Sequence, residues 1–81
     1  MESIERNGNI LIDLSSDEAL VLLDWLYRFN EREHPSLFQD QAEQRVLWDL
    51  ECVLEKLSVE IFKPDYEGLV AKAREKVRDK E

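Results

Sequence analysis

A chain of 81 residues, of which 43% are hydrophobic and 37% charged, is long enough for one domain and too apolar to stay disordered. Its formal net charge of −8 argues against a nucleic-acid partner, because phosphate binding needs clusters of Lys and Arg. The acid is concentrated in residues 1–62, which carry 14 acidic and 5 basic side chains, whereas residues 63–81 carry 5 and 6. This excess either keeps a small surface solvated or steers a cationic protein toward it.

The cellular compartment is predicted from what the sequence lacks. Cys52 is the only cysteine, so no internal disulfide can form and a reducing environment is expected. The N-terminal residues do not show the basic and then apolar pattern of a secretory signal. No apolar run approaches the roughly 18 residues needed to cross a bilayer. We therefore expect a cytoplasmic protein without a membrane partner.

Residues 2–14 predict a short β-hairpin. Asn7-Gly8 is the dipeptide favoured in type I′ turns, in which both central residues have positive φ. After the turn, Ile10, Ile12 and Leu14 alternate with other residues at the period of a half-buried strand. Because an isolated hairpin is marginal in water, we expect it to lie along one edge of the helices.

Residues 15–33 predict the first helix. Ser15 and Glu18 form a capping-box pattern, and His34-Pro35 ends the helix because proline forces the preceding residue out of the α conformation. The residues between Ala19 and Phe29 are apolar around most of the circumference, so this helix must be covered on more than one side.

Residues 40–57 predict an amphipathic second helix. Val46, Leu50, Val53 and Leu57 fall at positions i, i+4, i+7 and i+11 of one face, and Leu47 and Leu54 widen that face. Residues 58–62 fit either a short strand beside the hairpin or an extended linker.

Residues 64–79 predict the third helix, with Pro64 in its first turn. Its apolar positions at helical spacing are Tyr66, Leu69, Val70, Ala73 and Val77. The fold class is therefore mainly α: a single three-helix domain, made of an antiparallel αα-hairpin and a C-terminal helix, with a short N-terminal β-hairpin.

Few residues indicate chemistry. Glu31 and His34 have the i, i+3 spacing of ligands in carboxylate-bridged metal sites, but a solvated helix end is the stronger interpretation, and no metal or cofactor is expected. Cys52 has acidic neighbours and no activating base or positive charge beside it, so we expect a half-buried structural cysteine and not a nucleophile. Asp24 lies in the apolar helix, with Arg28 one turn later as its expected partner. Because the sequence shows no set of residues arranged for catalysis, we expect a protein that is not an enzyme.

Aromatic residues are the strongest indication of binding, because Trp and Tyr are favoured interface anchors, although core packing would also absorb them. The residues expected to form an interface are Trp25, Phe29, Glu43, Gln44, Arg45 and Trp48. For Arg45, a salt bridge to a carboxylate of the first helix is the competing interpretation.

A wider set of residues resembles a group of small bacterial proteins of uncharacterised function. The segments that carry this likeness are Asp17-Glu18-Ala19 with Trp25, residues 42–48 (AEQRVLW), Leu54-Glu55-Lys56, Phe62 with Pro64 and Tyr66, and Ala73-Arg74. The resemblance implies a bacterial source and a self-contained domain, and it implies no mechanism.

Three functions follow as hypotheses. The first is a protein-binding or regulatory module, with a homodimer through the first helix as one form. The second is an inhibitor or immunity-type protein whose acidic face blocks a basic partner such as a toxin or nuclease. The third, and weakest, is a metal or small-molecule protein using Glu31 and His34.

Overall fold

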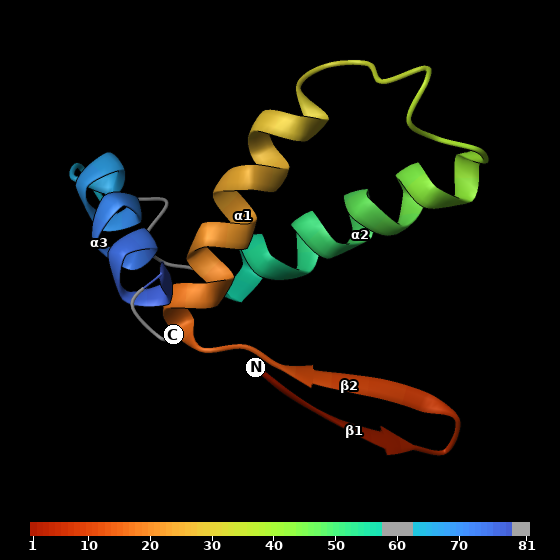
Figure 1. Ribbon diagram of the computed structural model, residues 1–81, viewed down its shortest axis with the longest axis horizontal. Coiled ribbons are helices and arrows are strands. Elements are labelled where there is room, and N and C mark those ends of the chain that lie inside the picture. The colour runs from red at the N-terminus through yellow and green to blue at the C-terminus, as the bar shows by residue number, and fades with distance from the viewer. Residues whose placement is uncertain (58–62, 79–81) are drawn as a thin grey trace.

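A computed structural model of the chain describes residues 1–57 and 63–78, so the prediction for residues 58–62 lies outside the described residues. Two antiparallel strands, β1 (Glu2–Arg6) and β2 (Asn9–Asp13), precede three helices, α1 (Ser16–Asn30), α2 (Gln41–Leu57) and α3 (Tyr66–Arg78). The mainly helical fold with an N-terminal β-hairpin is confirmed (Figure 1).

The β-hairpin has the predicted turn but a different position. Asn7 and Gly8 have φ of 51° and 84°, as a type I′ turn requires, and Glu2 pairs with Asp13 at the open end. Every strand residue is exposed, and the hairpin extends away from the helices in Figure 1. The expectation that it lies along the helices is wrong. Ile10 and Ile12 occupy one face and Leu11 the other, so no single face gathers enough apolar surface to hold it down.

Helix α1 begins with the predicted capping box. The Ser15 hydroxyl accepts a hydrogen bond from Glu18 N (3.1 Å), and the Glu18 carboxylate accepts one from Ser15 N (2.9 Å). The helix ends at Asn30, three residues earlier than predicted. The last turn closes because His34 Nε2 donates a hydrogen bond to Phe29 O (2.7 Å), which brings the chain back over the helix end.

Helices α2 and α3 each begin just after an aspartate. Asp40 accepts hydrogen bonds from Ala42 N through its carboxylate (2.7 Å) and from Glu43 N through its carbonyl (3.1 Å), close to the predicted start. The carbonyl of Asp65 accepts the first helical bond of α3, from Leu69 N (2.9 Å). Pro64 therefore lies before α3 and not in its first turn, a small correction to the predicted boundary.

Helix α1 is the centre of the molecule, with α3 on one side and α2 on the other (Figure 1). Leu20 packs with Val70 and Ala73 of α3, whereas Leu23 and Leu26 pack with Leu54 of α2. Covering α1 from two sides accounts for its nearly continuous apolar sequence, as predicted. Helices α1 and α2 run antiparallel. Asn30 at the end of α1 bonds to Glu51 (2.8 Å), whereas the earlier residues Leu23 and Leu26 pack with Leu54, which comes later in α2.

Candidate protein-binding surface

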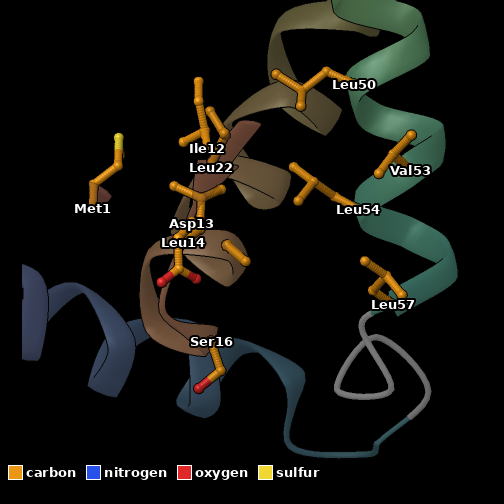
Figure 2. Close-up of a pocket in the computed structure, with 11 residues that line it drawn as sticks. Met1, Ile12, Asp13, Leu14, Ser16, Leu22, Leu50, Val53, Leu54 and Leu57 are labelled. Carbon is orange, nitrogen blue, oxygen red and sulfur yellow. The ribbon is translucent and has the colours of Figure 1, made fainter. Parts of the chain in front are cut away.

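An apolar groove of about 570 Å³ lies between the end of β2, the first turns of α1 and the second half of α2. Figure 2 shows Leu50, Val53 and Leu57 of α2 directed toward Ile12 and Leu14 on the opposite wall. Nine of the eleven lining residues are hydrophobic, and the Asp13 carboxylate and the Ser16 hydroxyl are the polar side chains. The complete lining is Met1, Ile12, Asp13, Leu14, Ser16, Ala19, Leu22, Leu50, Val53, Leu54 and Leu57.

The α2 face that forms this wall, continued by Val46 beyond the groove lining, is the most exposed apolar helix face in the described structure. Val46, Val53 and Leu57 have exposed fractions of 63%, 52% and 78%, and Leu50 between them is half-buried. Leu47 and Leu54, which lie to one side of this row, pack on the core of α1, and so does Leu50 of the row itself. The predicted amphipathic face is therefore divided: Leu47, Leu50 and Leu54 pack toward α1, and Val46, Val53 and Leu57 face solvent.

The sequence pattern identified this row as one face of an amphipathic helix. Periodicity shows which residues share a face of a helix, and it does not show whether a neighbour covers that face. The signal that could have found the site is the 4-3-4 spacing of Val46, Leu50, Val53 and Leu57, which is the a/d spacing of a coiled-coil seam.

Two of the predicted interface residues, Trp25 and Phe29, form an aromatic stack at the end of α1. Their ring centroids are 4.8 Å apart, and Phe29 also stacks on His34 at 3.9 Å and meets Phe38 edge-on at 5.9 Å. Trp25 is 43% exposed, whereas Phe29 is half-buried. The stack stabilises the end of α1 and the start of the following connection, with one face of Trp25 left to solvent.

The other four predicted residues lie in the first two turns of α2. The Glu43 carboxylate accepts a hydrogen bond from Gln39 N (3.0 Å), which makes it part of the helix start. Arg45 and Trp48 line a shallow hollow of about 490 Å³ with residues 40–42, while Gln44 is half-buried. Across residues 1–57 and 63–78, Arg45 makes no ion pair, so the alternative of a salt bridge to α1 is not seen there.

Asp24 joins α1 to α3 and does not belong to the groove. Its carboxylate accepts hydrogen bonds from Arg28 (3.2 Å), as predicted, and also from Arg74 (2.7 Å) and the Tyr66 hydroxyl (3.0 Å). Burial, together with the hydrogen bond to Asp24, raises the pKa of Tyr66 to about 12. On the other side of α1, burial and the carboxylates of Glu55 and Glu51 raise the pKa of Tyr27. These groups stabilise the helix packing.

His34 and Cys52 are the remaining residues that the sequence offered for metal binding or catalysis. His34 holds the end of α1 through Nε2, and the described residues bring together no set of three or more His, Cys, Asp or Glu side chains able to hold a metal. Cys52 is exposed, which corrects the prediction of a half-buried thiol; its position on α2 turns it away from the face that packs on α1. Among the helices described, none combines the length and apolar character needed to cross a bilayer.

Comparison with family models, with curated proteins and with solved structures gave no match to this chain. The resemblance to small bacterial proteins therefore stays a prediction, and the function must be inferred from the groove itself.

Proposed function

We propose that this chain is a small protein-binding or regulatory module without catalytic activity, and that the apolar groove between β2 and α2 is its docking surface. The observation that supports the proposal is the contiguous row of exposed apolar side chains on α2, which continues into the groove. An exposed apolar patch of this kind on a small protein typically marks a contact site, because leaving it in water loses the free energy of burial.

The composition of the groove favours a protein side chain as its occupant. Its walls are hydrocarbon with two polar groups, Asp13 and Ser16, both near the exit of β2. A groove of this kind with helical walls fits the apolar face of an amphipathic helix. The aromatic stack and the hollow at Arg45 and Trp48 both lie outside this lining.

The test is affinity capture from cells of the source organism with three versions of the chain as bait. Val53→Asp places a carboxylate in the groove, and the matched control Cys52→Asp places the same group on the neighbouring exposed position outside it. We expect the wild type and Cys52→Asp to retain the same protein, identified by mass spectrometry, and Val53→Asp to lose it. Identical captures by all three baits would contradict the proposal.

The acidic hairpin supports a second candidate, the inhibitor of a basic partner. Its strands expose Glu2, Glu5 and Asp13, with Arg6 as the basic side chain among them. A complex held by this charge would dissociate as salt is raised, because screening shortens the reach of exposed charges to about 3 Å at 1 M. Capture by the wild type that survives about 1 M salt would therefore favour the groove over the hairpin.

A further inference from the structure

We propose that the occupant of the groove is a second copy of this chain, and that two α2 helices pair antiparallel through Val46, Leu50, Val53 and Leu57. This inference rests on the proposed function, because it names the partner of the same surface. It differs from a dimer through the first helix, since α1 is already covered by α2 and α3.

The spacing of the row is self-complementary. Steps of four, three and four residues read the same in both directions, so a reversed second helix presents the same pattern. A two-fold axis near the middle of the row then sets Val46 against Leu57 of the other copy, and Leu50 against Val53. The result is four apolar layers of the kind that form a coiled-coil seam, with no polar residue in any layer.

The two flanks of the row select the antiparallel direction. A two-fold axis perpendicular to the helices brings each flank against the same flank of the second copy, whereas a parallel pair brings opposite flanks together. One flank, formed by Leu47 and Leu54, is covered by α1. The antiparallel pair brings the two free flanks together on one side of the seam and the two covered flanks together on the other, whereas a parallel pair sets a covered flank against a free one on both sides.

The free flank carries charges that match this direction. It presents Asp49 and Lys56, both exposed, and neither makes an ion pair within the residues that the structure describes. In the antiparallel pair Lys56 of the second copy lies level with residue 47, about 3 Å along the axis from Asp49 at a rise of about 1.5 Å per residue. Two opposite-charge pairs therefore form, one on each side of the axis.

The groove adds apolar contact to the seam. Four layers alone form a small interface, but a helix seated on α2 also meets Ile12, Leu14 and Leu22 on the other wall. By symmetry the α2 helix of each copy lies against the groove of the other, so this contribution is made twice.

The test uses the purified chain alone, with sedimentation equilibrium from about 1 to about 500 µM, a range that resolves dissociation constants typical of small modules. We expect the wild type to dimerise. Val53→Asp should weaken association about a hundredfold or more, because it buries an unpaired carboxylate in the seam. The matched control Cys52→Asp, one residue away and outside the seam, should leave it unchanged. Circular dichroism of each variant verifies that the helices are intact.

Charge exchange tests the direction of the pair. Asp49→Lys and Lys56→Asp each place like charges across the axis at two positions, and each should weaken association about tenfold. The double variant Asp49→Lys with Lys56→Asp restores opposite charges with unchanged composition, and it should return to within about threefold of the wild type. Single variants without effect, or a double variant as weak as the singles, would overturn the antiparallel pair.

The outcomes separate this inference from the proposed function. A wild type that stays monomeric at the highest concentration overturns the dimer. If affinity capture then still yields another protein that Val53→Asp loses, the groove is a docking surface for that protein and the proposed function stands. If Val53→Asp changes neither measurement, both the dimer and the function fail.

Discussion

Helices α1 and α2 are similar in length and both rich in apolar residues, yet the fold treats them differently. The apolar side chains of α1 are covered from two sides, and Leu23 and Leu26 are completely buried. Three members of the central row of α2, Val46, Val53 and Leu57, remain in solvent, whereas Leu50 and the flank of the row pack on α1. The difference shows that apolar content alone does not define a core: α1 is used for stability within one copy, and α2 offers a surface that one copy cannot cover.

The largest expected effect comes from shortening one apolar side chain on each helix to alanine and comparing the two losses of stability. Leu23→Ala should lower the free energy of unfolding by about 2–5 kcal/mol, because it leaves a cavity where the side chain is fully buried. Val53→Ala, at a side chain that is 52% exposed, should change it by less than about 0.5 kcal/mol. Urea denaturation at a concentration too low for association measures both. Equal losses would mean that the row on α2 is covered within a single copy.

The same pair of helices shows how far the sequence alone could lead. The capping box at Ser15 and Glu18, the Asn7-Gly8 turn and the face of α2 were all predictable, because each depends on local geometry or on periodicity. The role of Leu54 was not, since deciding which part of a broad apolar face packs inward requires the crossing of two helices. The surroundings of Phe29 were not predictable for a similar reason: its ring contacts His34 and Phe38, residues of the following connection.

The interface between α1 and α3 provides a second contrast with the apolar groove, because a polar cluster lies beside its apolar contacts. The pKa of Tyr66 is raised from 10.0 to about 12 in the fold, so the folded chain keeps a proton that the unfolded chain loses above about pH 10. The stabilisation is complete below that pH and is lost as the pH rises through the folded pKa. Unfolding followed between about pH 9 and pH 12 should show a decline in stability, smaller than the effect of Leu23→Ala.

Tyr66→Phe is the control for this pH dependence. It removes the titrating hydroxyl and keeps the ring that packs near Leu20, Val70 and Ala73. The variant should lose much of the decline, with the part due to Tyr27 retained, because the pKa of Tyr27 is also raised. A pH profile that Tyr66→Phe leaves unchanged would show that the hydrogen bond to Asp24 does not contribute in solution.

The smallest expected effect concerns the β-hairpin, the region with the least packing against the helices. Gly8 has φ of 84° and open space around its α carbon, so Gly8→Ala introduces backbone strain without a steric clash. The strain should cost about 1–2 kcal/mol and should act on the hairpin alone, because its strand residues are exposed and the helices hold together without them. Amide exchange should therefore quicken in residues 2–13 while the melting temperature of the helices stays unchanged. If the melting temperature of the helices fell as well, the hairpin and the helices would unfold as one unit. The groove wall formed by Ile12 would then be as stable as the wall formed by α2.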